Sequence, residues 1–209
     1  MPGRVTGRDD AEVVRADCDV RRRKLLRDRA RARDVGGEDA GRAPGVVYEN
    51  NGVRVTAIEV NHGEKIRPAF GYVIAYDGKT VVLSGDTKPD PRIVRAASGA
   101  DLLIHEVAII DPELVKDYPS YRAIEDHHTS PEDAGRIFTE ARPKLAVYSH
   151  IVFATKVPVQ EVPEDALLKR TRSTYAGPLV IGRDLMSFVV SDTVQAFAPN
   201  SNAAQPLAP

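Results

Sequence analysis

Residues 81–87 read Val-Val-Leu-Ser-Gly-Asp-Thr, and this stretch decides the fold because an apolar strand ends there on a carboxylate. Asp86 follows three residues of a type that sheets bury, and Gly85 lets the backbone bend just before it. An unpaired carboxylate at such a position is costly, so Asp86 has to be hydrogen-bonded, cap a helix or bind a metal ion. From this stretch alone, a turn or helix-capping role and a metal-binding role both stay open.

Two histidines repeat this placement. His62 follows Val60 and Asn61, and His150 follows the stretch Val-Tyr-Ser at 147–149. Taken singly, each is explained by a hydrogen-bonded histidine at a strand end. Together with Asp86 they favour a zinc-like divalent ion, which imidazole nitrogens and carboxylates bind, and a carboxylate can bridge two ions. One aspartate and two histidines are too few for a two-metal centre, because each ion needs about three protein ligands and a water.

The segments around these residues alternate between strands and helices. Turn signals at 50–52 and at Asp77-Gly78 predict two hairpins, and Thr129 with Glu132 predicts a capping box. The predicted strands are residues 46–49, 53–60, 70–76, 79–83, 101–105, 144–149, 179–181 and 185–190, and the predicted helices are 91–98, 131–141 and 163–172. This order predicts an α/β fold with helices packed outside a sheet.

The chain divides into three parts by composition. Residues 1–45 hold 12 basic and 9 acidic residues, and we expect a peripheral helix over 11–33 followed by a linker. The basic run 21–24 could bind phosphate, but the acidic residues interleaved with it favour a solvated helix face. Residues 46–195 form the expected domain, and residues 196–209 are rich in Ala, Pro and Asn, which predicts a disordered tail.

Bulk composition excludes several classes of site. The 29 basic and 30 acidic residues nearly cancel, so no global field favours nucleic acid or a membrane surface. Cys18 is the single cysteine, which excludes an intramolecular disulfide and a zinc site built on paired cysteines. No run approaches the roughly 18 apolar residues of a membrane span, and the first residues do not resemble a signal peptide. We therefore expect a cytoplasmic protein with no membrane partner.

The order and spacing of six short stretches, together, are specific. They read VNHG at 60–63, FGY at 70–72, LSGDT at 83–87, DLLIHE at 101–106, HTS at 128–130 leading into EDA at 132–134, and YSH at 148–150. In these stretches the segment 53–153 resembles the C-terminal half of metallo-β-lactamase-fold hydrolases of the ribonuclease Z-like branch. The resemblance implies an αββα sandwich, of which this chain carries about half, with peripheral or disordered ends.

The resemblance also implies metal ligands. His62 is similar to the ligand of the family's third motif, His150 to its last histidine ligand and Asp86 to its bridging carboxylate. The metal expected from this resemblance is zinc, two ions in a complete member and a weak or partial site here, with manganese as an alternative.

A proton donor is implied by the same comparison. His128 resembles the histidine that protonates the leaving oxygen in phosphodiester cleavage, and Glu106 would orient and charge it. His127 is the less favoured alternative, because His128 is the one followed directly by Thr129 and Ser130.

One motif of the family is missing. Its members take most metal ligands from an upstream His-x-His-x-Asp-His motif, whereas residues 1–61 of this chain contain no histidine. The sequence is then either a truncated reading of a longer gene or a pseudoenzyme. Truncation is favoured because the other polar groups of the site are all retained, namely His62, Asp86, Glu106, His128 and His150.

The expected function is that of a metal-dependent hydrolase which cleaves phosphodiesters in its full-length parent and is inactive as this chain. Alternatives are a sulfatase, a lactonase or another esterase of the superfamily, and a non-catalytic binding or assembly subunit completed by a partner chain. An incomplete sandwich would also expose an apolar face, which predicts self-association into a homo-oligomer.

Overall fold

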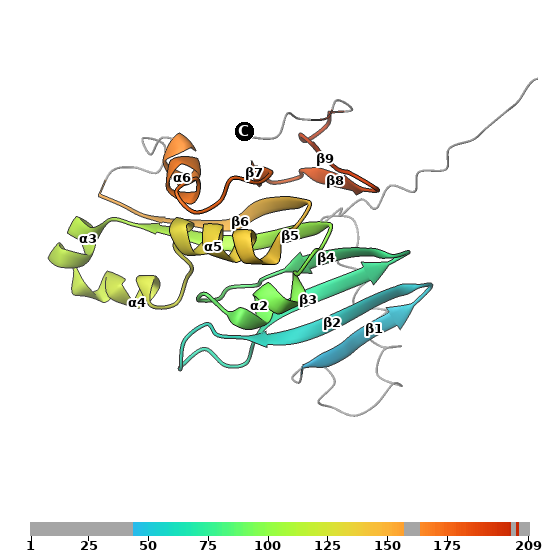
Figure 1. Ribbon diagram of the computed structural model, residues 1–209. Helices are drawn as coiled ribbons and strands as arrows, with labels where there is room; N and C mark the ends of the chain where they lie inside the picture. The colour runs from blue at the N-terminus through green and yellow to red at the C-terminus, as the bar shows by residue number, and fades with distance from the viewer. Residues whose placement is uncertain (1–43, 157–163, 202–203, 205–209) are drawn as a thin grey trace, which may run out of the picture.

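A seven-stranded sheet forms the centre of the molecule (Figure 1). The computed structural model describes residues 44–156, 164–201 and 204. The strands of the sheet, in spatial as well as chain order, are β1 (Gly45–Asn50), β2 (Val53–Val60), β3 (Ala69–Tyr76), β4 (Lys79–Leu83), β5 (Leu102–Ile110), β6 (Leu145–Ala154) and β7 (Leu179–Ile181). With helices packed against this sheet, the predicted α/β class is confirmed.

The sheet changes character at β4. From β1 to β4 neighbouring strands are antiparallel, and from β4 to β7 they are parallel. Asn51 and Gly52 close the first hairpin and Asp77 and Gly78 close the second, all four with positive φ, as the turn signals predicted. Parallel neighbours need longer crossovers, and these contain the helices.

The crossovers are helical. α2 (Pro91–Ala96) joins β4 to β5, and α6 (Glu164–Thr171) lies between β6 and β7. Between β5 and β6 the chain forms α3 (Pro112–Asp117), the 3₁₀ turn η2 (Pro119–Tyr121), α4 (Arg122–Glu125) and α5 (Pro131–Ala141). Among the described residues, no helix has the length and apolar character needed to cross a lipid bilayer.

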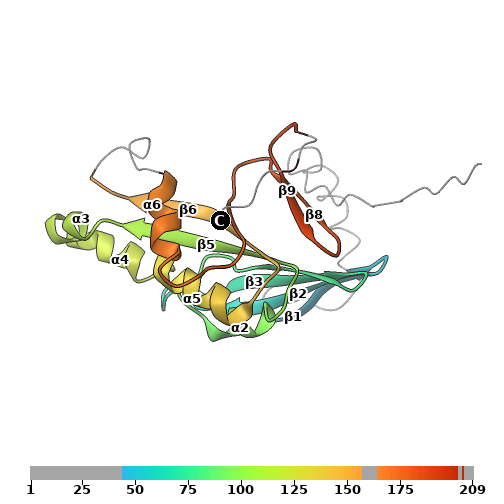
Figure 2. The same cartoon turned by 45° about the horizontal axis from the view of Figure 1, so that its top comes forward.

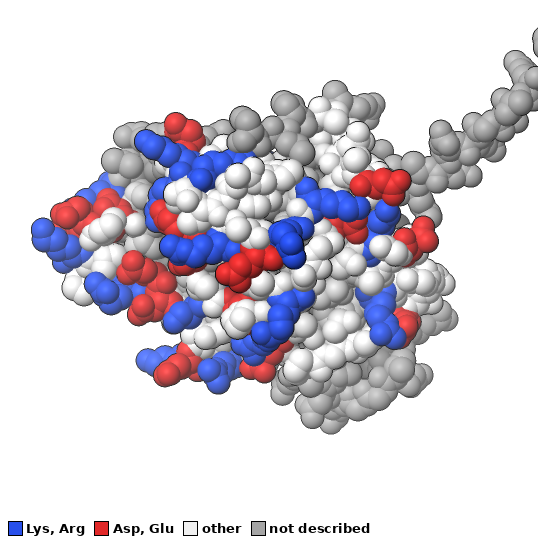
Figure 3. All heavy atoms as spheres, in the orientation of Figure 1, with Lys and Arg blue, Asp and Glu red and all other residues white. Residues whose placement is uncertain are grey.

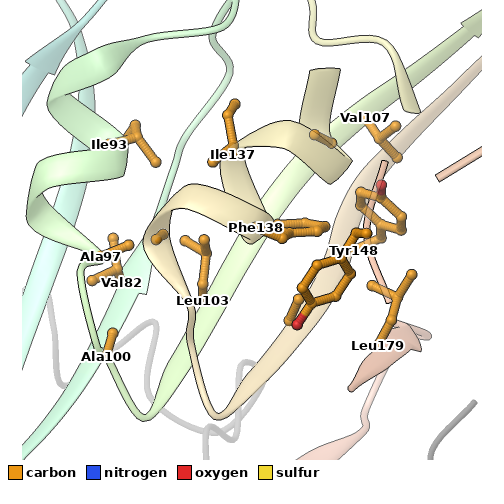
Figure 4. Close-up of a cluster of buried hydrophobic side chains, with 14 of the residues drawn as sticks. Val82, Ile93, Ala97, Ala100, Leu103, Val107, Ile137, Phe138, Tyr148 and Leu179 are labelled. Atoms are coloured by element: carbon orange, nitrogen blue, oxygen red, sulfur yellow. The ribbon is translucent and has the colours of Figure 1, made fainter. Parts of the chain in front are cut away.

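The main core lies between the sheet and α2, α5 and α6 (Figure 4). Val82 and Leu103 from the strands meet Ile93 from α2 and Phe138 from α5, and all four side chains are buried. The Phe138 ring lies 5.4 Å from that of Tyr148. Such close packing holds β4, β5 and β6 against the helical layer.

A smaller core covers the opposite face of the parallel strands. The hairpin of β8 (Ser187–Val190) and β9 (Val194–Phe197) lies on the side away from the helices (Figure 2). Val194 and Ala196 pack there with Leu145 and Val147 of β6. β5 and β6 are therefore covered on both faces.

Several predictions differ from the structure. β5 and β6 extend past their predicted ends at 105 and 149, because they pair with each other as far as Ile110 and Ala154. The short helices of 112–125 were not predicted, and β9 continues two residues into the tail predicted to be disordered because Ala196 is fully buried. Most of that tail and the expected helix at 11–33 lie outside the described residues.

The cap of α5 also differs from the prediction. The helix covers the predicted residues 131–141, but Ser130 is its N-cap, and the Ser130 hydroxyl accepts a hydrogen bond from the Asp133 amide at 3.1 Å. Thr129 is instead fully buried, and its hydroxyl donates to the Thr87 carbonyl at 2.7 Å. The cap therefore lies one residue later than the sequence pattern indicated.

Candidate active site

The topology brings the predicted site residues to one edge of the sheet. Because β2 is antiparallel to β3 and β3 to β4, β2 runs in the same direction as β4, β5 and β6 (Figure 1). His62 follows the end of β2 and Asp86 follows β4, while Glu106 and His150 lie in β5 and β6. The carboxyl ends of parallel strands are where α/β sheets present ligand-binding groups.

The turn before Asp86 depends on Gly85. Gly85 has a φ of +61°, and a Cβ at this position would lie 2.2 Å from the Phe70 carbonyl oxygen, so only glycine fits. The N-cap of α2 is Asp90, whose side chain accepts from the Arg92 amide. Because Asp90 caps that helix, Asp86 does not, and its side chain is 44% exposed at the sheet edge.

A bulge in β6 brings the His150 side chain next to Asp86. On β5 the register advances from His105 to Val107, whereas on β6 it advances from Tyr148 to Ile151, so β6 contains one extra residue. His150 has a φ of +44°, in the left-handed region. Its Nε2 lies 3.6 Å from Oδ2 of Asp86, so these two predicted metal ligands are neighbours.

Glu106 and His128 form a buried pair. His128 Nδ1 lies 2.9 Å from Glu106 Oε2, and the side chains are 12% and 1% exposed. The other carboxylate oxygen accepts from the Thr129 amide at 2.7 Å, and the Glu106 amide donates to the Ser84 hydroxyl at 3.0 Å. The hydrogen bond to Glu106 raises the pKa of His128 above its usual value. With Nδ1 engaged, Nε2 of the protonated ring is the nitrogen left to donate a proton.

His62 is oriented through the backbone of His127. Its Nδ1 lies 2.9 Å from the His127 carbonyl, so an N–H at Nδ1 leaves the lone pair of Nε2 for another partner. The ring centroids of His62 and His150 lie 5.1 Å and 5.6 Å from that of His128. The three imidazoles therefore meet in one place.

The sequence did not reveal what His127 contributes. Gly63 has a φ of +90°, and a Cβ there would lie 2.4 Å from Cδ2 of His127, so the ring packs directly on the glycine. His127 supplies its carbonyl to His62 and its ring to this contact. In the sequence, the glycine that follows His62 was the local sign of a close contact at this position. The residue that makes the contact, His127, is distant in the chain.

His105 stays out of the site. It is fully buried with its ring edge-on to Phe138, and its Nδ1 lies 2.6 Å from the Glu106 carbonyl. Burial lowers the pKa of His105, and its Nε2 has no hydrogen-bond partner in the described part of the chain. His105 is therefore a neutral core histidine.

The described residues fit part of a metal site. Two ligands at about 2.0–2.1 Å from a tetrahedral zinc ion lie about 3.4 Å apart. The His150–Asp86 separation of 3.6 Å is close to this value. Within 44–156 and 164–201, however, no three His, Cys, Asp or Glu side chains are placed to hold one ion together. His150 and Asp86 would hold the metal, with His62 nearby.

Comparison with known proteins agrees with this architecture. A family model for the β-lactamase superfamily domain matches residues 18–151. Ribonuclease Z of Myxococcus xanthus is 30% identical over 127 residues, which are 61% of this chain and 38% of the relative. Ribonuclease Z of Mycobacterium tuberculosis is 32% identical over 143 residues, which are 68% of this chain and 50% of the relative. The chain thus spans half or less of these curated relatives.

A solved structure shares the fold. The metallo-β-lactamase fold protein YhfI of Bacillus subtilis superposes with a TM-score of 0.51 at 19% identity. The match covers 78% of this chain and 54% of that protein.

Proposed function

Because this chain belongs to the β-lactamase superfamily and is ribonuclease Z-like within it, we propose that it forms part of a metal-dependent hydrolase of phosphodiester bonds. The observation that carries the proposal is the buried Glu106–His128 pair beside Asp86 and His150. A carboxylate behind an imidazole sustains a proton donor, and the oxygen that leaves a phosphodiester needs a proton.

Each side chain has a defined task in this proposal. Glu106 holds the His128 ring by Nδ1 and raises its pKa, so the ring keeps a proton on Nε2 at a higher pH than a free histidine would. His128 then protonates the leaving oxygen. His62, Asp86 and His150 are the proposed metal ligands, with zinc or manganese as the metal. When bound, such an ion activates water and stabilises negative charge on the phosphate.

The chain alone should bind metal weakly and hydrolyse its substrate slowly, if at all. A catalytic zinc site has about three protein ligands, and the described residues gather two at ligand spacing. Further ligands would have to come from residues that the structure does not describe or from a second polypeptide. Self-association is one way to supply a second polypeptide, and it stays a prediction.

A chelator-controlled assay tests this function. The purified chain, with zinc or manganese, is offered bis-p-nitrophenyl phosphate and a precursor tRNA. Because the described ligand set is incomplete, we expect hydrolysis at most slightly above that of a chelated control. Any turnover should be removed by chelation and by Asp86→Ala, and strongly reduced by His128→Ala. Asp165→Ala, an exposed aspartate on α6, is the matched control and should leave the rate unchanged.

Two outcomes would contradict the proposal. Hydrolysis that survives both chelation and Asp86→Ala would exclude a metal bound at this edge of the sheet. Preferential hydrolysis of a carboxylate ester such as p-nitrophenyl acetate, with the same sensitivity to these variants, would favour an esterase or lactonase. Metal titration of the same variants, followed by calorimetry, reports on the ligands independently of turnover.

A further inference from the structure

Figure 3 shows basic and acidic side chains intermixed on one face of the surface. Three carboxylates among the described residues are buried instead, those of Asp90, Asp101 and Glu106, with 3%, 6% and 2% exposed. Glu106 holds the proposed proton donor, and Asp101 pairs with Lys144 just before β5. A buried carboxylate is costly unless its oxygens are hydrogen-bonded, so the partners of Asp90 indicate what this third carboxylate does.

Asp90 accepts hydrogen bonds from two separate segments. As the N-cap of α2, its Oδ1 accepts from the Arg92 amide at 2.8 Å, and the Arg92 guanidinium bonds to both carboxylate oxygens. Its Oδ2 also accepts from the Asn61 amide at 3.0 Å. Capping needs only one acceptor atom, which a neutral serine would supply. The bond from Oδ2 to Asn61 is therefore separate from the capping of α2.

The backbone of Asn61 is bonded on both sides to the segment that follows Asp86. Its amide donates to Asp90, while its carbonyl accepts from the Lys88 amide at 2.7 Å and from the Thr87 hydroxyl at 3.2 Å. Both polar backbone groups of this residue are thus held by the loop between β4 and α2.

His62 follows Asn61 directly, so the same bonds reach a proposed metal ligand. On the other side of His62, the Gly63 amide donates to the Asn61 side chain at 3.1 Å, and the His62 ring is oriented by the His127 carbonyl. Outer partners of this kind determine how a ligand meets its metal, and their loss lowers metal affinity by roughly 10–100-fold.

We propose that Asp90 positions His62 relative to Asp86, and so joins the ligand of the antiparallel half of the sheet to those of the parallel half. This inference rests on the proposed metal site and adds a positioning residue that lies outside its ligands. If Asp90 served only to cap α2, its replacement by serine would leave His62 unaffected.

Asp111 provides a matched control for this test. It is the N-cap of α3, which like α2 has six residues and begins with proline. Its side chain accepts from the Glu113 amide of its own helix at 2.9 Å. Asp111→Ser therefore makes the same chemical change as Asp90→Ser, at a cap on a different crossover.

Metal affinity is the first measurement. Zinc is titrated into the unaltered full chain and into each variant, and binding is followed by calorimetry. We expect Asp90→Ser to bind zinc about tenfold more weakly, and Asp111→Ser to bind it as the unaltered chain does. Asp90→Ala should weaken zinc binding by the same factor but unfold at a lower urea concentration than Asp90→Ser, because alanine also removes the cap.

The tautomer of the His62 ring is a second measurement and needs no metal. The hydrogen bond to the His127 carbonyl favours a proton on Nδ1 of the neutral ring. Long-range ¹H–¹⁵N NMR at about pH 8, above the ordinary histidine pKa of about 6.5, reports which nitrogen carries it. The fraction protonated on Nδ1 should fall in Asp90→Ser and stay unchanged in Asp111→Ser.

Unchanged zinc affinity together with an unchanged His62 tautomer in Asp90→Ser would show that Asp90 only caps α2. That result would overturn the assignment and leave the proposed metal site in place. Equal losses in Asp90→Ser and Asp111→Ser would overturn it as well, because a general loosening of the fold would explain both. If the unaltered chain binds no zinc, the metal site itself is contradicted, and the tautomer comparison still decides whether Asp90 positions His62.

Discussion

The parallel and antiparallel halves of the sheet are covered to different extents. β5 and β6 are packed between helices on one face and the β8–β9 hairpin on the other, whereas β1 is exposed along its whole length and Val46 is 50% exposed. Asp86, Glu106 and His150 come from the covered half, and His62 alone comes from the antiparallel half. The difference indicates that the buried strands determine the geometry of the site, because their side chains cannot move without disturbing both cores.

The contrast is tested most strongly by truncating one apolar side chain from each region, Phe138 on α5 over the parallel strands and Val47 on the exposed strand β1. Phe138→Ala should lower the free energy of unfolding by about 3–5 kcal/mol, because the ring is fully buried among other aromatic rings. Val47→Ala, on the exposed β1, should change it by less than about 0.5 kcal/mol. Urea denaturation measures both, and comparable losses would show that β1 is covered in solution.

Disrupting the buried Glu106–His128 pair should have the next largest effect on the free energy of unfolding. Glu106→Gln should lower the free energy of unfolding by about 1–3 kcal/mol, because the carboxylate accepts two hydrogen bonds in a buried position. The pKa of His128 is raised in the folded state. The contribution of this pair is therefore fully present below the unfolded pKa of about 6.5 and is lost as the pH rises through the folded value.

The loss caused by Glu106→Gln should accordingly be larger at pH 6 than at pH 9. NMR titration of the His128 ring in both proteins provides a second measurement, and its pKa should fall in the variant. An unchanged pKa would mean that Glu106 does not charge His128.

Replacing His105 should have a smaller effect on the free energy of unfolding, with the opposite dependence on pH. Burial lowers the pKa of this histidine, so the unfolded chain takes up a proton near pH 6.5 and the folded chain does not. Stability should then fall with decreasing pH below about 6.5, by up to about 1.4 kcal/mol per pH unit from this group. His105→Leu should remove this part of the slope between pH 7.5 and 5.5, and parallel slopes for the two proteins would show that His105 does not resist protonation.

The smallest effect is expected on the exposed hairpin. Arg54 and Glu49 form an ion pair with side chains 55% and 59% exposed. Glu49→Ala should lower the free energy of unfolding by less than about 0.5 kcal/mol, and the difference should disappear in 1 M salt. A loss as large as that of Glu106→Gln would abolish the contrast between the two halves.

Local sequence patterns were sufficient to predict much of the fold. β2, β4, β7 and α5 have the predicted bounds, and the Asp77-Gly78 turn lies where it was expected. Hydrophobic periodicity, turn residues and the first turn of a helix act over a few neighbouring positions, so a sequence displays them directly. The longer ends of β5 and β6 were not visible, because they are stabilised by pairing with each other.

For the site, the sequence by itself placed His62 and Asp86 correctly after the ends of strands, because an apolar run that gives way to a polar residue is a local property. His150 was expected at a strand end as well, but it lies within β6, which continues to Ala154. Tertiary structure decided which groups meet. Glu106 reaches His128 across 22 positions, and the His127 carbonyl reaches His62 across 65. The extra residue in β6 that directs His150 exists only relative to its pairing with β5. Such contacts depend on backbone hydrogen bonds between distant segments, which no local pattern of residues encodes.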